Sequence, residues 1–237
     1  MLFRSLVIGV AGFLAAMYLA SHSSPPPPGS DIAELLSRNP ETIPFLFGRV
    51  FDLNLATIGA FRAPLLATGI ALLLGTGLNW MLRRRGAPAA GNWALVAMMV
   101  VVLLSALQAM VIFEPVTTSK PLALAIQSAY RPGDVIVINA EYEKASTINF
   151  YAQLPVHVLD NRTGNLWYGS LFPDAPRVHV DYAWLAQQWK GPARVFLWTD
   201  KRYRERALRG IPQPQVFEFA ASGGKLILTN RPPVPQR

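Results

Sequence analysis

Two long apolar runs constrain this chain more than any other feature of its sequence. Residues 61–82 and 92–113 are predominantly apolar, and each has the length of about 20 residues that a helix needs to cross a bilayer. A shorter apolar run covers residues 3–20. Because helices of this kind are too apolar to be solvated in a small globular protein, the sequence predicts a membrane anchor of about three transmembrane helices over residues 1–113.

The first run has two interpretations. Arg4, the apolar stretch that follows it and Ser21-His22-Ser23 are compatible with a retained membrane helix and with a cleaved signal peptide. The length of the stretch and its flanking residues favour the retained helix. Both interpretations place the segment that follows, residues 21–60, outside the cytoplasm.

The arginine triplet between the two longer runs predicts the orientation of the chain. Arg83-Arg84-Arg85 lies in a short loop, and short arginine-rich loops stay in the cytoplasm. Trp80 and Trp93 flank this loop as residues of an aromatic belt do. We therefore expect a cytoplasmic amino terminus, a cytoplasmic hairpin turn and an extracytoplasmic domain over residues 114–237.

The outer loop, residues 21–60, contains an aromatic segment that is too short to span a membrane. Residues 45–52 read Phe-Leu-Phe-Gly-Arg-Val-Phe-Asp, a composition typical of a segment in the membrane interface. It could pack against the spans or cover a ligand. Arg49 in this segment and Arg62 after it are candidate contacts to lipid headgroups.

Composition excludes several classes of function. The chain has no cysteine, which excludes disulfides, thiol catalysis and cysteine-ligated metals. Residues 114–237 contain 15 Lys+Arg and 10 Asp+Glu. This mildly basic balance suits anionic lipids or phosphorylated ligands, but it lacks the dense basic stripe of a nucleic-acid-binding domain, so no nucleic-acid partner is expected.

The second half of the chain predicts an α/β domain. Apolar strand-like runs at residues 135–138, 156–159 and 195–198 alternate with helical patterns at residues 120–130, 142–152, 182–189 and 200–209. Two further strands flank Ser222-Gly223-Gly224, a hairpin turn. This alternation predicts a mainly parallel sheet with helices on both faces and a C-terminal hairpin.

Candidate ligand-binding residues follow the predicted strands, because parallel α/β sheets bind ligands outside the carboxyl ends of their strands. The long loop after the second strand adds aromatic and amide side chains that suit a sugar or a lipid headgroup. Its alternative role is to cover the sheet edge or to dock on the membrane helices. The candidates are Glu141, Asp160, Asn161, Asn165, Trp167, Tyr168 and Asp200.

A basic segment closes the last predicted helix. Arg202, Arg206 and Arg209 are spaced at i, i+4 and i+7, so they would share one face of a helix over residues 200–209. The face could contact anionic headgroups. The alternative is a solvated surface, which is the commoner role of such a run.

Catalytic motifs are not found in the sequence. The three histidines are His22, His157 and His179. His179 and Asp181 would share one face of an extended segment and could form a metal pair, but no third ligand stands out. Ser222-Gly223-Gly224-Lys225 lacks the spacing of a phosphate-binding loop, and no serine-hydrolase motif occurs. We therefore predict neither a catalytic residue nor a metal site in this chain.

Several segments nevertheless form a diffuse pattern over most of the chain. They are Gly75-Thr76-Gly77-Leu78-Asn79-Trp80, Lys120-Pro121-Leu122-Ala123, Glu141-Tyr142-Glu143-Lys144-Ala145-Ser146, Asn149-Phe150-Tyr151, Pro155-Val156, Asn165-Leu166-Trp167-Tyr168-Gly169, Arg194-Val195-Phe196-Leu197, Gly223-Gly224-Lys225 and Thr229-Asn230-Arg231-Pro232. This pattern resembles the carboxy-terminal region of the GT-C-type membrane glycosyltransferases, namely the bacterial relatives of dolichyl-phosphate-mannose–protein mannosyltransferases and the lipid A aminoarabinose transferases.

The resemblance implies transfer of a sugar from a polyprenyl-phosphate donor at the outer side of a bacterial inner membrane. In the family, the catalytic acid lies in an early outer loop, where a divalent metal could bind in the complete enzyme. This sequence begins within what resembles the last third of such a protein, so we expect no catalytic carboxylate and no cofactor in it. The implied partners are membrane lipid, the polyprenyl-phosphate sugar and a companion chain with the missing helices. The alternative is a non-catalytic binding or assembly module of the cell envelope.

Overall fold

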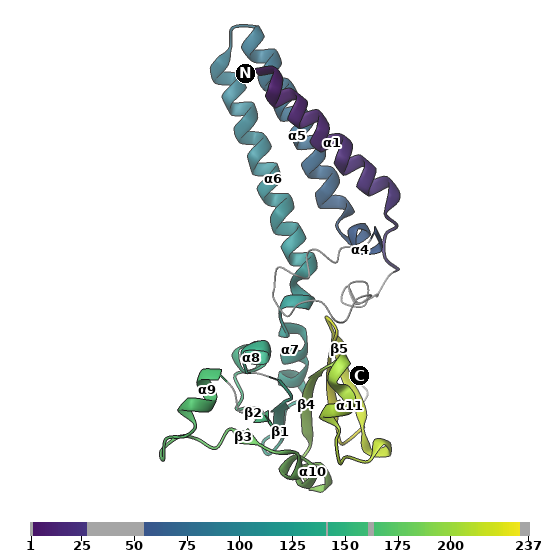
Figure 1. Cartoon of the computed structure of the whole chain (residues 1–237), viewed down its shortest axis with the longest axis vertical. Helices are drawn as coiled ribbons and strands as arrows, with labels where there is room; N and C mark the ends of the chain where they lie inside the picture. Colours follow the sequence, from purple (N-terminus) through teal and green to yellow (C-terminus); the bar gives the residue numbers. More distant parts are fainter. Residues whose placement is uncertain (1, 28–54, 141, 161–163, 233–237) are drawn as a thin grey trace. The chain divides into compact units, whose positions relative to one another are not determined.

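The structure is a computed structural model that describes residues 2–27, 55–140, 142–160 and 164–232 (Figure 1). The chain separates into two compact units, Met1–Glu114 and Pro115–Arg237. The segment around Arg49, which the sequence predicts to lie in the membrane interface, is outside the described residues, as are Glu141 and Asn161.

Long apolar helices build the first unit. It contains α1 (Leu2–His22), α4 (Leu55–Ala60), α5 (Arg62–Arg84) and most of α6 (Pro88–Thr117). Within the described part of the chain, α1 from Arg4, α5 and α6 are each long and apolar enough to cross a membrane, which confirms the three predicted spans. Helix α6 exceeds its predicted range at both ends, and Pro88 is tolerated at its start because a first-turn residue needs no N–H bond.

Small residues bring α1 and α5 into close contact. A Cβ atom on Gly69 would lie 2.7 Å from Ala16 Cβ, and one on Gly9 would overlap the Thr76 hydroxyl. Such small-residue interfaces are typical of membrane helices, which associate by close backbone packing. A cleaved signal peptide would leave this face of α5 without its partner.

Polar side chains join α5 to α6 near their connecting turn. Arg83 Nε donates to Asn79 Oδ1 at 2.9 Å, and Arg83 Nη2 donates to Asn92 Oδ1 at 2.6 Å. Asn79 is buried. Arg84 lies over the Trp80 ring at 4.2 Å. Arg83 of the arginine triplet therefore also ties α5 to α6.

The second unit is an α/β domain with a six-stranded sheet of order β3-β2-β1-β4-β6-β5. Strands β1 to β4 pair in parallel, whereas β6 pairs antiparallel with β4 and with β5. This confirms the predicted mainly parallel sheet with its C-terminal hairpin. The elements are α7 (Lys120–Ala129), β1 (Val135–Ile138), α8 (Tyr142–Ala152), β2 (His157–Leu159), α9 (Gly164–Gly169), β3 (His179–Val180), α10 (Tyr182–Lys190), β4 (Val195–Asp200), η1 (Lys201–Tyr203), α11 (Arg204–Ala207), η2 (Gln213–Gln215), β5 (Phe217–Ser222) and β6 (Lys225–Thr229).

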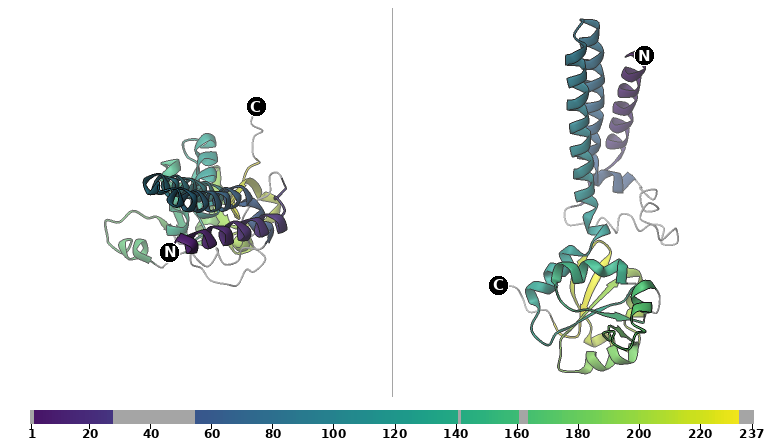
Figure 2. Two further views of the ribbon diagram at one scale, coloured as in Figure 1. Left: turned by 90° about the horizontal axis from the view of Figure 1, so that it is seen from above. Right: turned by 90° about the vertical axis from the view of Figure 1, so that its left-hand side faces the viewer.

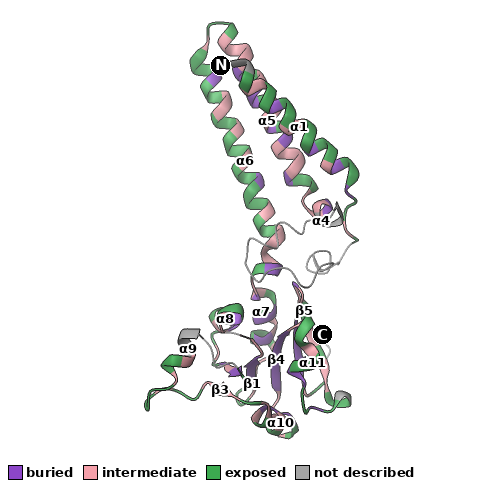
Figure 3. Cartoon of the chain, viewed as in Figure 1, coloured by how far each residue is buried: buried purple, intermediate pink, exposed green. Residues whose placement is uncertain are grey.

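Helices cover both faces of the sheet (Figure 2). On one face, α7 and α8 pack with Ile136 and Phe196. On the other face, α10 and α11 pack with Val137 and Leu197. Alternate residues of β1 and β4 thus enter different cores, which explains why both strands read as continuous apolar runs. Figure 3 shows these strands as buried, whereas α6 is exposed along much of its length.

Two local predictions differ from the structure. The segment predicted as one helix over residues 200–209 is divided into η1 and α11, because the Asp200 carboxylate accepts the Arg202 backbone N–H and starts a new turn there. The long loop after β2 contains the short helix α9 and ends in β3.

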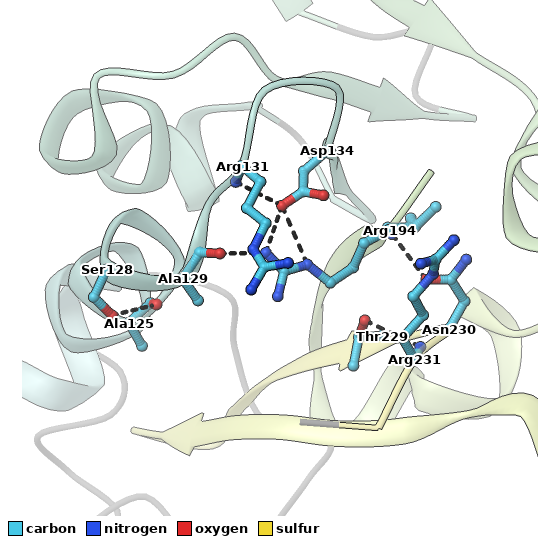
Figure 4. Close-up of polar contacts among 10 residues, drawn as sticks. Ala125, Ser128, Ala129, Arg131, Asp134, Arg194, Thr229, Asn230 and Arg231 are labelled. Carbon is cyan, nitrogen blue, oxygen red and sulfur yellow. Dashed lines mark hydrogen bonds and ion pairs between the residues drawn. The ribbon is translucent and has the colours of Figure 1, made fainter. Parts of the chain in front are cut away.

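A polar network closes the amino end of the parallel strands (Figure 4). Arg194 forms an ion pair with Asp134, with Nη2 2.5 Å from Oδ2, and the same guanidinium donates to the Ala129 carbonyl. Asn230 accepts the Val195 N–H at 2.9 Å and donates to two backbone carbonyls. Segments that carried the family resemblance, around Arg194 and Asn230, therefore meet in a structural network.

The tip of the β5–β6 hairpin binds the residues that open the second unit. The buried Lys225 ammonium donates to the carbonyls of Pro115, Val116 and Thr118 at 3.2, 2.9 and 2.6 Å. Gly223 has a φ of +60°, and a Cβ atom there would overlap the Pro115 carbonyl. A glycine is therefore required at this turn.

Candidate functional site

The carboxyl ends of β1 and β4 form the topological switch point of the sheet, because β2 and β4 lie on opposite sides of β1. Here Asn139 Nδ2 donates to Thr199 Oγ1 at 3.2 Å, and the Asn139 N–H donates to the Trp198 carbonyl at 2.9 Å. Thr199 is fully buried. The two strand ends are therefore tied together by polar side chains.

The chain enters the second unit at this same edge of the sheet. Trp198 Nε1 donates to Ser119 Oγ at 3.1 Å, and the Ser119 N–H donates to Thr147 Oγ1 at 3.0 Å. Lys225, opposite Asp200 in the sheet register, binds the carbonyls that precede Ser119. Hydrogen bonds within the protein thus occupy much of the switch-point edge.

Asp200, a predicted ligand residue, is engaged locally. Its Oδ1 and Oδ2 accept two hydrogen bonds from the Arg202 guanidinium at 3.0 and 2.9 Å. The hydrogen bond to Asp200 raises the pKa of Arg202. This pairing fixes the start of η1 and engages the Arg202 guanidinium.

Arg206 and Arg209 instead gather around Tyr182. The Arg209 guanidinium lies 5.5 Å from the Tyr182 ring centre. The Tyr182 hydroxyl beside Arg206 raises the pKa of that arginine, and the Asp160 charge adds to the effect. The structure therefore brings the predicted residues Asp160, Arg206 and Arg209 into one exposed region near the carboxyl ends of β2 and β3.

The aromatic residues of α9 have different environments. Trp167 is half-buried and packs edge-on against His179, with ring centres 5.2 Å apart. Tyr168 is exposed, as are Leu171 and Phe172 after it. The backbone of Asn165 lies in α9, whereas Arg62 is exposed at the start of α5 in the first unit.

The two histidines of the sheet do not form a metal site. Because Val158 pairs with His179 in register, the neighbouring His157 points to the opposite face. Burial lowers the pKa of His157. Among the residues that the structure describes, no group of three His, Asp or Glu side chains could hold a metal ion.

A cleft runs along α8 and the segment that follows it, with a volume of about 520 Å³. The sequence predicted none of its residues as ligands, although several belong to the segments that carry the family resemblance. The feature that marks this cleft is the exposure of the Phe150 side chain, which the structure shows and the sequence does not. The lining residues are Tyr142, Ser146, Thr147, Asn149, Phe150, Gln153, Leu154 and Pro155.

Comparison with protein-family models gives no match, and comparison with curated proteins gives none either. Two solved structures resemble the chain, both of ArnT from Cupriavidus metallidurans. The structure bound to undecaprenyl phosphate and the apo structure each align with a TM-score of 0.60, at 19% and 18% sequence identity. Each alignment covers 99% of this chain and 38% of the ArnT chain.

The likeness establishes the fold. The chain has the same fold as part of ArnT, a lipid A aminoarabinose transferase of the GT-C type, and this confirms at the level of the fold the resemblance seen in the sequence. The alignment spans both the membrane helices and the α/β unit, since it covers 99% of the chain.

Proposed function

We propose that this chain is the C-terminal module of a polyprenyl-phosphate-dependent membrane glycosyltransferase. The observation that supports the proposal is the match of almost the whole chain to ArnT, which was solved with undecaprenyl phosphate bound. A match confined to the α/β unit would support only a common soluble fold. Here the membrane helices and the α/β unit match together.

The proposed role of the chain is to support transfer without supplying the reactive carboxylate. The chain matches 38% of the ArnT chain, and we assign the chemistry to other transmembrane helices of the complete enzyme. These helices would be supplied by a companion chain or by another part of the same protein. The surface of α6 can contact lipid tails or such helices, because large apolar side chains are exposed along it, including Leu103, Leu104, Leu107, Met110 and Val111.

The proposed location is the bacterial inner membrane, with the amino terminus in the cytoplasm and the α/β unit in the periplasm. Arg62 and the arginine triplet lie at opposite ends of α5. If the triplet is cytoplasmic, Arg62 lies at the outer interface, where its charge can bind a lipid phosphate. Arg206 and Arg209 are further candidate contacts for an anionic headgroup.

The proposal is tested by lipid binding to the full chain in phosphatidylcholine nanodiscs. We expect undecaprenyl phosphate to bind at least tenfold more tightly than dioleoyl phosphatidic acid, which presents a similar phosphate on different chains. Native mass spectrometry measures both affinities. Equal binding of the two lipids would show only attraction to a basic surface and would contradict the proposal.

A matched pair of variants locates the phosphate. Arg62→Gln is expected to weaken binding of undecaprenyl phosphate severalfold because it removes a cation at the outer end of α5. Arg84→Gln removes a cation at the other end of the same helix and is expected to leave binding unchanged. Similar effects of the two substitutions would rule out a specific contact at Arg62.

The second candidate function is a non-catalytic binding module of the cell envelope. The α8 cleft favours it, because a ligand site in the α/β unit needs no catalytic helices. Saccharide binding by a chain that shows no preference for undecaprenyl phosphate would support this module over the glycosyltransferase.

A further inference from the structure

The α8 cleft differs in charge from the unit in which it lies. Residues 114–237 carry a net positive charge, yet the cleft is lined by neutral side chains. A phosphate or carboxylate ligand would find no cation in this lining. Its volume of about 520 Å³ falls within the range of ligand sites, roughly 300–1,000 Å³. The lining therefore favours a neutral, polar ligand.

The lining of the cleft includes the exposed aromatic ring of Phe150. Phe150 leaves 65% of its surface exposed, although large aromatic side chains are usually buried. Its ring packs edge-on against Tyr151, with ring centres 5.1 Å apart and an interplanar angle of 88°. The Phe150 ring is thus held in place while much of its surface remains open to a ligand.

The polar side chains of the cleft hold one another in position. The Tyr142 hydroxyl donates to Asn149 Oδ1 at 3.2 Å, and Asn149 Nδ2 donates to the Leu154 carbonyl at 2.7 Å. The Ser146 hydroxyl donates to the Glu143 carbonyl at 3.2 Å. A hydroxyl that donates one bond still has acceptor lone pairs, and an amide nitrogen has two hydrogens. The cleft therefore presents fixed acceptors and a donor.

Gln153 occupies a backbone conformation that its residue type rarely adopts. Its φ is +56° at the end of α8, where glycine or asparagine is usual. Its side-chain amide donates to the Phe150 carbonyl at 2.5 Å. This contact places the glutamine amide against the backbone of Phe150, at a position where glycine would relieve the backbone strain.

From this arrangement we propose that the α8 cleft binds a neutral saccharide. A sugar ring has apolar C–H faces that stack on an aromatic ring, and its hydroxyls both donate and accept hydrogen bonds. Phe150 supplies the stacking surface, and Tyr142, Ser146, Asn149 and Gln153 supply the polar contacts. The proposal concerns the cleft alone and does not depend on the glycosyltransferase function.

The test uses the full chain in nanodiscs, because glycoside detergents would compete for the site. Maltotriose, chitotriose and mannotriose serve as neutral probes, and trigalacturonic acid serves as the anionic probe. Saturation-transfer NMR titrations are expected to show saturable binding of at least one neutral trisaccharide and weaker binding of the acid. Failure of all three neutral probes to bind, or a preference for the acid, would overturn the proposal.

Variants assign the binding to the cleft. Phe150→Ala is expected to weaken binding of the trisaccharide at least tenfold. Leu171→Ala truncates a similarly exposed apolar side chain outside the cleft and is expected to leave binding unchanged. Equal affinity of Phe150→Ala and the unchanged protein would sink the proposal. Phe150→Ala is expected to bind undecaprenyl phosphate as well as the unchanged protein does. The proposed saccharide site and the proposed lipid binding can therefore be tested independently.

A second variant separates binding from folding. Gln153→Gly removes the amide from the cleft and also relieves the left-handed backbone strain. We expect the melting temperature to be maintained while saccharide binding weakens severalfold. Unchanged binding would remove Gln153 from the site and overturn the polar half of the proposal.

Discussion

Gly223 shows how a single residue position can depend on two constraints. Its backbone has a positive φ, and a Cβ atom there would overlap the Pro115 carbonyl. Gly133 has a positive φ of +95° but open space around its Cβ position. The two glycines therefore separate the cost of backbone strain from the cost of steric overlap.

Gly223→Ala is expected to lower the melting temperature of the full chain more than Gly133→Ala does. Alanine at Gly133 costs only the strained conformation, about 1 kcal/mol. At Gly223 the hairpin must also move away from the three carbonyls that Lys225 binds, which brings the loss to about 3 kcal/mol or more. Thermal unfolding followed by tryptophan fluorescence measures both. Equal losses would show that the close approach to Pro115 is absent in solution.

His157 makes the stability of the α/β unit depend on pH. Burial lowers the pKa of His157 below its ordinary value of 6.5, and its ring packs on Trp184. Below pH 6.5 the unfolded chain binds a proton more readily than the folded chain does, so stability falls as the pH decreases through this value.

His157→Gln is expected to reduce the loss of melting temperature between pH 7.5 and pH 5.5. His22→Gln, which changes an exposed residue of α1, serves as the control and is expected to keep the full loss. If His157→Gln retains the same pH dependence, another group is responsible for it.

At the scale of the elements, two glycines of α5 test the packing of the membrane helices. Gly69 faces Ala16 of α1, with 2.7 Å between a built Cβ and Ala16 Cβ, whereas Gly77 has no neighbour within 4 Å of its Cβ position. Close backbone approach is a main source of affinity between membrane helices. A larger side chain at Gly69 must therefore separate α1 from α5.

Gly69→Leu is expected to destabilise the chain in detergent by about 1–3 kcal/mol, the usual range for overpacking. Gly77→Leu adds the same side chain to open space and is expected to be neutral or slightly stabilising. The midpoint of unfolding in a denaturing-detergent titration compares them. A Gly77→Leu variant as unstable as Gly69→Leu would contradict the α1–α5 interface.

The elements that the sequence predicts best are those with long, uniform patterns. The spans follow from apolar length, and β1 and β4 follow from continuous apolar runs that enter two cores. Strand β3 was not predicted because it has only two half-buried residues, His179 and Val180. The single helix over residues 200–209 was wrong because a local carboxylate, Asp200, starts a new turn.

Part of the candidate site could also be predicted, because the apolar pattern that identifies a strand also shows where the strand ends. Strand ends can be located from a sequence, and this places Asp160 and Asp200 at the correct edge of the sheet. Their partners depend on the fold: Arg202 pairs with Asp200, whereas Arg206 and Arg209 meet at Tyr182. The α8 cleft was missed because its residue types are ordinary, and only packing leaves Phe150 exposed.

At the scale of the whole molecule, charge distribution predicts the orientation in the membrane. The lack of natural cysteine makes labelling unambiguous. Ala89→Cys and Asp174→Cys each introduce one cysteine at an exposed position. In intact spheroplasts, we expect a membrane-impermeant maleimide to label the Asp174→Cys variant and not the Ala89→Cys variant. After lysis of the spheroplasts, we expect both variants to be labelled. Labelling at position 89 before lysis would reverse the proposed topology.

The sheet order has a consequence for biogenesis. Strand β6 covers the edge of β4, and Lys225 bonds to residues as many as 110 positions earlier in the chain. Until the chain has been made as far as Thr229, β4 presents an unpaired apolar edge, which is prone to aggregation. The domain must therefore wait for its final strands. In the proposed topology, a periplasmic chaperone that shields strand edges would serve it during this interval.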